Sequence, residues 1–280
     1  MSRSIRLTLV AAAMSVGLTS SAHAVLLSYE SFSGYPNANN DIVGQNGGTG
    51  FGGAWGSPSS DGFLHTVRTP TAIAYPGYNG ATTPAASGGN FLNLAAAFGG
   101  SNPTAVFRSL DTSGGGSYGT NGYLTGGLIG ADNTTLWASV LYSDEKVKAG
   151  NQSFATISLD GTTYDNTLVQ TQTSNLVVYK FNFGAGATDT ITSYANPNLA
   201  TFDGTTGGVT SAPGNYAFNT LRITQTYANG PGDQGAETQF DDIRFGTTLA
   251  DVAPAVPEPT SIAILGIATI GLLARRRRNA

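Results

Sequence analysis

The side chains able to do chemistry in this 280-residue chain are mainly carboxylates, because it contains no cysteine and only two histidines. The absence of cysteine excludes thiol catalysis and cysteine-ligated zinc or iron–sulfur sites. Outside the N-terminal segment the one histidine is His65. A metal site with several histidines is therefore excluded, and a Ser-His-Asp triad would have to use this residue. No Gly-x-Ser-x-Gly elbow accompanies it, and we expect His65 to be a half-buried strand residue.

Carboxylates occur as two adjacent pairs, Asp144-Glu145 and Asp241-Asp242. Retaining hydrolysis of a glycosidic bond needs two carboxyl groups about 5 Å apart that face one cleft. Neighbouring residues of a strand point to opposite faces of a sheet, so neither pair meets this requirement. Glu237 and Asp241 share a face only if their strand runs unbroken between them. We therefore expect that the chain is not an enzyme.

One turn carries oxygen ligands suited to a hard cation. The sequence Asp-Gly-Thr-Thr-Tyr-Asp-Asn places the carboxylates of Asp160 and Asp165 and the amide of Asn166 around this turn, and calcium prefers such ligands. Asp and Gly are also common turn formers, so the same residues fit a polar hairpin between strands, which is the interpretation that we favour. We expect no other cofactor.

Aromatic residues in predicted loops are candidates for stacking on sugar rings, because exposed Tyr and Trp rings are common at recognition surfaces. The alternative is that these rings pack the loops onto the core, and for Trp55 this is the favoured interpretation. The sequence singles out none of them as a glycan-binding residue. The six candidates are Tyr35, Trp55, Tyr75, Tyr78, Tyr118 and Tyr123.

Short strands joined by turns must position these residues. Apolar side chains alternate with period two, as in the run from Thr135 to Ser143, and no stretch between the two ends shows an unbroken helical pattern of about 12 residues. The glycine-rich segment that ends at Trp55 is expected to be a loop that docks this ring on the core. The pattern predicts an all-β fold of two packed antiparallel sheets, with strands at Leu26–Glu30, Phe63–Arg68, Asn90–Ala96, Ala105–Leu110, Thr135–Ser143, Ser153–Leu159, Asn175–Phe183, Thr188–Tyr194, Asn219–Thr226 and Thr238–Phe245.

Three segments, 175–197, 219–224 and 240–245, resemble strands of laminin-G-like and concanavalin A-like jelly rolls. In the last one, regular alternation predicts an exposed ion pair between Asp242 and Arg244 over buried Ile243 and Phe245. The resemblance implies a concanavalin A-like jelly roll in which calcium is often bound. Members range from lectins to glycosidases, so the fold does not decide the function. Its laminarinase-like enzymes carry Glu-x-Asp-x-x-Glu, which this chain lacks; a divergent glycoside hydrolase is the alternative function.

The N-terminus has the organisation of a secretory signal peptide. Arg3 and Arg6 form a positive region, residues 7–18 are apolar, and Ala22-His23-Ala24 is an A-x-A cleavage site. The mature chain is expected to start at Val25. An uncleaved N-terminal helix is the disfavoured alternative, because the apolar run is short for a membrane span.

The C-terminus combines a proline-flanked glutamate, an apolar run and an arginine cluster. Val256, Pro257, Glu258 and Pro259 form an extended acidic hinge, because proline restricts itself and the residue before it. Residues 260–274 would form a helix of ~22 Å, shorter than the ~30 Å hydrocarbon core of a bilayer. Behind them Arg275, Arg276, Arg277 and Arg278 act as a stop-transfer signal and stay in the cytoplasm.

These three parts, in this order, resemble the PEP-CTERM sorting signal of bacterial exported proteins. The resemblance implies an exosortase as partner, which removes the tail and releases or transfers the protein. The alternative is an ordinary tail anchor with arginine flanks. We expect a chain that is tethered by its C-terminal helix and then reaches the cell surface or the extracellular space.

The expected organisation is a signal peptide (1–24), a β-sandwich domain (25–250), a proline-rich linker (251–259), a short transmembrane helix (260–274) and an arginine-rich cytoplasmic tail (275–280). Without both ends the chain keeps seven basic and sixteen acidic residues, a net charge of about −9. This charge excludes a nucleic acid as partner, since phosphate binding depends on Lys and Arg. It is compatible with divalent cations and neutral glycans. The expected function is a structural or carbohydrate-binding role towards extracellular polysaccharide.

Overall fold

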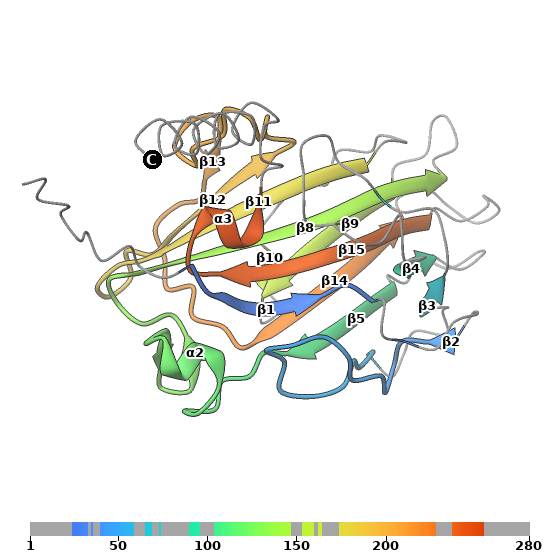
Figure 1. Cartoon of the computed structure of the whole chain (residues 1–280), viewed down its shortest axis with the longest axis horizontal. Helices are drawn as coiled ribbons and strands as arrows, with labels where there is room; N and C mark the ends of the chain where they lie inside the picture. The colour runs from blue at the N-terminus through green and yellow to red at the C-terminus, as the bar shows by residue number, and fades with distance from the viewer. Residues whose placement is uncertain are drawn as a thin grey trace, which may run out of the picture.

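The computed structural model describes residues 24–32, 35, 40–58, 65–68, 73, 90–95, 104–146, 153–159, 162–163, 174–227 and 237–254. Within them the regular secondary structure is almost entirely β-strand (Figure 1). The strands are β1 (Leu26–Glu30), β2 (Asn40–Asp41), β3 (His65–Arg68), β4 (Phe91–Ala95), β5 (Thr104–Ser109), β6 (Leu124–Thr125), β7 (Leu128–Ile129), β8 (Thr134–Lys146), β9 (Ser153–Leu159), β10 (Thr162–Thr163), β11 (Ser174–Phe183), β12 (Thr190–Ala195), β13 (Val209–Thr210), β14 (Thr220–Tyr227) and β15 (Glu237–Gly246). Two single-turn helices, α2 (Ser117–Thr120) and α3 (Leu249–Val252), complete the elements.

The strands form two main sheets. A nine-stranded sheet has the order β13-β12-β11-β8-β15-β4-β3-β2, with β1 as a further partner of β15, and a four-stranded sheet has the order β10-β9-β14-β5. Strands β6 and β7 form a separate ribbon. All pairings between these strands are antiparallel. The prediction of antiparallel sheets is confirmed.

Strand β15 pairs with three other strands of the nine-stranded sheet. One edge pairs with β8 along its length, whereas the other edge pairs first with β4 and then with β1. Figure 1 shows β1 and β4 following one another along the same side of β15. The first strand of the domain is therefore held by its last strand.

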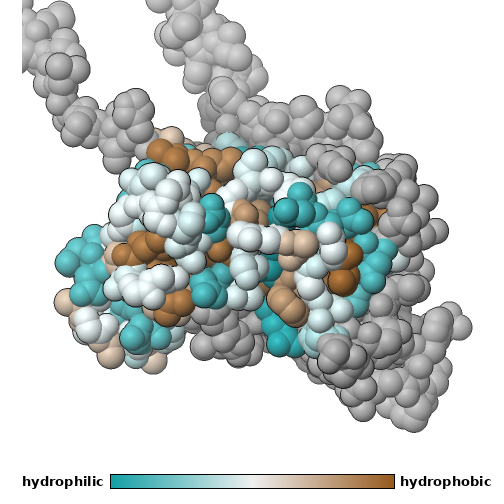
Figure 2. All heavy atoms as spheres, turned by 90° about the horizontal axis from the view of Figure 1, so that it is seen from below, coloured by the Kyte–Doolittle hydropathy of each residue, from teal (hydrophilic) through white to brown (hydrophobic). Residues whose placement is uncertain are grey.

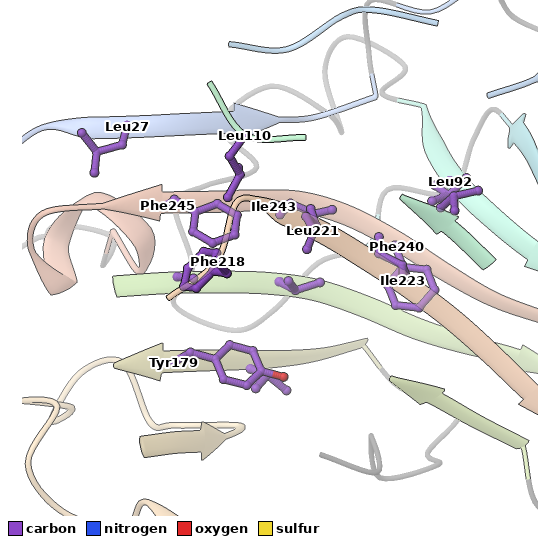
Figure 3. Packing of buried hydrophobic residues seen from close by; sticks show 14 of the residues in the cluster. Leu27, Leu92, Leu110, Tyr179, Phe218, Leu221, Ile223, Phe240, Ile243 and Phe245 are labelled. Atoms are coloured by element: carbon purple, nitrogen blue, oxygen red, sulfur yellow. The ribbon is translucent and has the colours of Figure 1, made fainter. Parts of the chain in front are cut away.

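Apolar side chains of both sheets meet in an inter-sheet core. Figure 3 shows Phe240, Ile243 and Phe245 of β15 in the same cluster as Leu221 and Ile223 of β14. All five are at most 2% exposed. The predicted alternation of β8 is confirmed, because its even-numbered residues from Leu136 to Tyr142 lie in this core.

The opposite face of the nine-stranded sheet carries a second apolar cluster, which we call the outer cluster. It contains Trp137 and Leu141 of β8, Leu176 and Val178 of β11, and Val252 at the end of α3. Strands β8 and β11 are therefore buried on both faces, as expected for central strands.

Within the described residues, no helix is long and apolar enough to cross a membrane.

All ten predicted strands are confirmed within one to three residues at most ends, and Leu26–Glu30 and Ser153–Leu159 match the observed bounds. The start of the strand predicted from Phe63 lies outside the described residues before His65. The prediction missed the two-residue strands β2, β6, β7, β10 and β13, because two residues carry no readable period.

The predicted regular alternation in β15 is wrong at one point. The register with β8 shifts between Asp241 and Arg244, and Asp242 has a left-handed φ of 47°. This β-bulge brings Phe240 into the same core as Ile243, although three positions separate them. The ion pair between Asp242 and Arg244 does form, but their side chains are only 2% and 12% exposed. The expected surface pair is thus mostly buried.

Large apolar side chains that reach the surface are few among the described residues. They are Leu26, Val43, Phe107 and Val209, which come from separate segments. On the face seen in Figure 2, small hydrophobic groups alternate with hydrophilic and neutral residues. Isolated exposed apolar side chains are normal on a folded surface.

Candidate functional site

A buried ion pair connects the two sheets. Glu30, at the end of β1 in the nine-stranded sheet, accepts a hydrogen bond of 2.6 Å from Nη1 of Arg108, on β5 of the four-stranded sheet. Both residues are 1% exposed. Tyr35 and Trp55 donate to the same Oε2 atom, and the backbone N–H of Phe32 donates to Oε1 (2.9 Å). The carboxylate is therefore surrounded by donors.

The same arginine holds the loop that precedes Trp55. Arg108 donates through Nε to the carbonyl of Gly53 (2.8 Å) and through Nη2 to Oδ1 of Asn46 (2.7 Å). Its guanidinium lies 4.2 Å from the ring centroid of Phe51, which adds a cation–π contact. Gly50, with φ of 75°, approaches β1 so closely that a Cβ would lie 2.0 Å from the carbonyl oxygen of Leu27. Only glycine fits there.

This polar centre is a structural element. Burial and the neighbouring Glu30 raise the pKa of Tyr35, so its hydroxyl stays protonated and donates to the carboxylate. Trp55 is 1% exposed and lies in the inter-sheet core, which confirms that the glycine-rich loop docks this ring. A carboxylate with this many donors is poorly placed to transfer a proton to a ligand.

The bulge in β15 forms a second polar centre. Asp241 is 3% exposed and Asp242 is 1% exposed. The backbone N–H of Asp242 donates a hydrogen bond to Oδ1 of Asp241 at 2.8 Å. Arg244 binds Asp242 through Nε at 2.8 Å and lies over the ring of Tyr29. Strained left-handed backbone and bulges often occur at functional sites.

Asp241 is the described carboxyl group with a strongly raised pKa. Burial is the main cause, and the negative charge of Asp242 adds to it. A buried carboxyl group of this kind can act as a proton donor near neutral pH. The Asp241-Asp242 pair was expected to be a regular strand pair, and the bulge is what places both carboxyl groups in buried positions.

A third polar feature is a row of side chains on the outer face of the nine-stranded sheet, which we call the polar row. Thr66 on β3 pairs with Asn93 on β4, and Asn93 pairs with Gln239 on β15. Leu92 and Leu94, the neighbours of Asn93, point into the inter-sheet core, so the row faces the other way. Residues opposite one another on adjacent strands have Cβ atoms about 5 Å apart.

Two members of the polar row have buried side chains that lack hydrogen-bond partners among the described residues. Asn93 is 0% exposed and Thr66 is 3% exposed. Within the part of the chain that the structure describes, the Asn93 amide and the Thr66 hydroxyl have no partner. A buried polar group left in this state costs about 1–3 kcal/mol, and native proteins contain few of them. The arrangement is suited to a ligand that both donates and accepts hydrogen bonds.

The sequence alone does not predict this row. Asn93 lies inside a predicted apolar strand, and its only signal is an amide between two leucines. The register that aligns it with Thr66 and Gln239 depends on strands about 27 and 146 residues away, which a local pattern does not contain.

Most of the predicted aromatic candidates are packing residues. Tyr35, Trp55, Tyr118 and Tyr123 are all at most 6% exposed, which agrees with the packing alternative for these four and with the favoured interpretation of Trp55. The hydroxyl of Tyr118 is 2.8 Å from that of Ser28. Tyr75 and Tyr78 lie outside the described residues.

His65 is a strand residue, as expected, but it is buried rather than half-buried, with 2% exposure at the start of β3. Its Nδ1 lies 3.5 Å from Oδ1 of Asp41. The described residues contain no group of three or more His, Cys, Asp or Glu side chains that could hold a metal ion.

The calcium candidates Asp160, Asp165 and Asn166 lie outside the described residues. The sorting residues Val256, Pro257, Glu258 and Pro259, the stop-transfer residues Arg275, Arg276, Arg277 and Arg278, and Ala22 of the cleavage site also lie there. Ala24 is described and exposed, two residues before the start of β1 at Leu26. The described domain therefore runs between the two predicted processing signals.

Comparison with protein families identifies the C-terminal signal. Residues 255–278 match the model of the PEP-CTERM protein-sorting motif. This match confirms the resemblance predicted for the tail. A sorting signal of this kind implies an exported protein and is recognised by an exosortase. None of the curated proteins compared with the chain matches it.

Several solved structures are similar to the domain. An endo-β-1,4-glucuronan lyase from the fungus Trichoderma reesei is 11% identical with a TM-score of 0.41, over 71% of this chain and 97% of that one. The CBM22-1 xylan-binding domain of Xyn10C from Paenibacillus barcinonensis is 11% identical with a TM-score of 0.34, over 81% and 97%. The binding domain of botulinum neurotoxin DC is 10% identical with a TM-score of 0.35, over 69% of this chain and 45% of that one. Similarity at this level assigns neither an activity nor a ligand.

Replacement of Arg108 tests the importance of the inter-sheet ion pair. Arg108→Met leaves Glu30 buried without its cation, and we expect the free energy of unfolding to fall by about 3–5 kcal/mol. Arg222→Met, at a half-buried position of β14, should change it by no more than about 0.5 kcal/mol. Chemical denaturation measures both. Equal effects of the two substitutions would show that the pair is not a main source of stability.

The raised pKa of Asp241 predicts a pH-dependent stability. Its contribution is complete below the unfolded-state pKa of about 3.9 and is lost as the pH rises through the higher folded-state pKa. Asp241→Asn removes this loss, so the variant should gain melting temperature relative to the wild type as the pH rises from about 4 to about 8.

Asp203→Asn is the matched control for Asp241→Asn. The hydroxyl and the backbone N–H of Thr205 lower the pKa of Asp203, so its contribution is lost only as the pH falls below about 4, and its difference curve should be nearly flat between about pH 4 and pH 8. A flat difference curve for Asp241→Asn would contradict the assignment of a raised pKa to this carboxyl group.

Proposed function

We propose that this chain is an exported protein that an exosortase processes at its C-terminus, and that its mature part binds extracellular polysaccharide without catalysis at the cell surface or in the extracellular matrix. The matched sorting motif supports the first half of the proposal. In this proposal the β-sandwich is a concanavalin A-like jelly roll. The short apolar segment 260–274 serves as a temporary membrane tether before its removal.

The polar row is the observation that supports carbohydrate binding. Its side chains are two amides and one hydroxyl, from Asn93, Gln239 and Thr66. Sugar hydroxyl groups both donate and accept hydrogen bonds, and a carboxamide offers one acceptor beside two donors. Adjacent strands lie about 4.8 Å apart, a spacing close to the length of one hexose unit. A neutral glycan segment lying across β3, β4 and β15 would therefore meet one member of the row on each strand.

Thr66, Asn93 and Gln239 are at most 7% exposed, so in this proposal a glycan reaches them only after the atoms that cover the row move aside. Asp41, opposite Thr66 on the edge strand β2, is 60% exposed, so this movement would start from the solvent-exposed edge of the sheet. The mature part carries a net charge of about −9. This charge repels anionic polysaccharides and leaves neutral glycans as the matching class.

A divergent glycoside hydrolase is the alternative function. It is favoured by Asp241, whose raised pKa is typical of a general acid. Against it, Glu30 is engaged by Arg108, and Asp242 is engaged by Arg244, so neither is an available second carboxylate. The non-catalytic function is the better supported of the two.

Substitution of Asn93 separates binding from stability. Asn93→Leu removes two buried unpaired polar atoms, so we expect the free energy of unfolding to rise by about 1 kcal/mol or more. We expect retention of the exported protein on gels of neutral polysaccharide to fall at least about tenfold, because the sugar loses its partners. Thr192→Val, at a half-buried position of β12 far from the row, is the control and should retain wild-type binding.

Each outcome of this experiment has a distinct meaning. Wild-type protein that is retained by no glycan gel contradicts the binding function. Retention that Asn93→Leu leaves unchanged contradicts the polar row as its site. Release of reducing ends by the wild type, lost in Asp241→Asn, would establish the hydrolase instead.

A further inference from the structure

The two ends of the domain meet in one hydrogen-bonded contact. Val25 donates its backbone N–H to the hydroxyl of Thr247 (3.1 Å), and Thr247 donates its own N–H to the carbonyl of Val25 (3.1 Å). The contact extends the pairing of β1 with β15, in which Leu26 lies opposite Gly246. Val25 directly follows the predicted cleavage site. The nitrogen atom in this contact is therefore the one that cleavage converts from an amide into an ammonium group.

The carboxylate of Asp251 lies behind this contact. Its Oδ2 atom accepts hydrogen bonds from the hydroxyl of Thr247 (3.2 Å) and from the N–H (2.8 Å) and hydroxyl (2.9 Å) of Thr248. Within the described residues no donor is bonded to Oδ1. The Thr247 hydroxyl accepts from Val25 and donates to Asp251, so it links the nitrogen to the carboxylate.

Among the described residues, no cation is bonded to the side chain of Asp251. Arg244 is bonded to Asp242, and towards Asp251 it reaches only the backbone carbonyl, at 3.4 Å from Nη1. Two tyrosines lie near these charges: the ring of Tyr29 lies under Arg244, and the negative charge of Asp251 acts on Tyr123. Burial raises the pKa of both tyrosines, so they stay neutral. In the described surroundings the Arg244–Asp242 pair cancels, and the Asp251 charge is unbalanced. One added positive charge would balance it.

Cleavage supplies a group that fits this position. An amide nitrogen has one N–H, and that of Val25 is already used by Thr247. A primary ammonium group has three donors and a positive charge. It can keep the bond to Thr247, which is itself bonded to Asp251, and gain the electrostatic attraction to this carboxylate that the amide lacks.

The position of Asp251 is itself fixed by the sheet. A Cβ on Gly246 would lie 2.3 Å from Cβ of Asp251, so only glycine at this position of β15 permits the approach. In the same short helix the carbonyl of Val252 accepts from the hydroxyl of Ser139 at 2.6 Å, and Val252 lies in the outer cluster. The chain then leaves the described domain at Pro254, one residue before the matched sorting motif.

We propose that Thr247 and Asp251 form a binding site for the α-ammonium group created at Val25 when the signal peptide is removed. Through this site, N-terminal processing stabilises the segment from which the C-terminal sorting signal emerges. The inference rests on the proposed export, because it requires cleavage after Ala24. It adds a ligand, the mature N-terminus of the same chain, and couples the two processing events through α3.

The test uses protein exported by its own host and follows the α-amine. Its pKa, obtained from the pH dependence of its reaction with an amine reagent, should lie above the ordinary 7.7–8.0 of a terminal amine, since a nearby carboxylate favours the charged form. Asp251→Asn should return the pKa to the ordinary range. Insertion of one serine after Ala24 moves the ammonium group by one residue and should also return the pKa of the α-amine to the ordinary range. Asp203→Asn is the control and should leave the pKa of the α-amine raised.

Stability provides a second readout. A raised folded-state pKa means that the stabilisation is complete below the unfolded-state value and is lost as the pH rises through the folded-state value. Between about pH 7 and pH 9.5 the melting temperature of the wild type should therefore fall by about 1–3 °C more than that of Asp251→Asn.

The outcomes separate this inference from the proposed export. A mass that shows no cleavage after Ala24 would contradict the export on which the inference depends. A chain that starts at Val25 but has an ordinary amine pKa, unchanged by Asp251→Asn, would leave export intact and overturn the binding site.

Discussion

The ion pair between Glu30 and Arg108 is the interaction on which the rest of the sandwich depends. It is the described contact that joins β1 of one sheet to β5 of the other through fully buried charges. A buried ion pair is tolerated when additional hydrogen bonds surround both charges. Here Tyr35, Trp55 and the loop before Trp55 provide those bonds. The pair therefore also determines the path of that loop and the burial of its aromatic residues.

The pairing of β15 with β8, β4 and β1 is the second interaction that determines the arrangement of the domain. One edge of β15 pairs with β4 before the bulge and with β1 after it. At the bulge Asp242 adopts a left-handed conformation, and two carboxyl groups are buried. The first and last strands are neighbours, so both ends of the domain lie close together. This arrangement places Val25, the predicted start of the mature chain, beside the segment that leads to the sorting motif.

Strand positions were readable from the sequence because burial on a sheet imposes a period of two, which survives in runs such as that of β8. The sites were not, because they depend on register between distant strands. Asn93 is part of a polar row only because the register places it beside Thr66 and Gln239. Arg108 forms a buried ion pair only because the fold places it beside Glu30. The bulge at Asp242 also breaks the alternation from which an exposed ion pair was predicted. The tail was readable because a sorting signal is a linear pattern that needs no fold.

The central claim is that the functional product is the domain between two processing sites. The most direct test is the intact mass of the protein from its own host, measured separately for the cell-bound and the secreted fractions. The account predicts a species that starts at Val25 and ends between Val256 and Pro259. A mass that still includes Arg275 to Arg278 would show that the tail is a permanent anchor and would contradict the account.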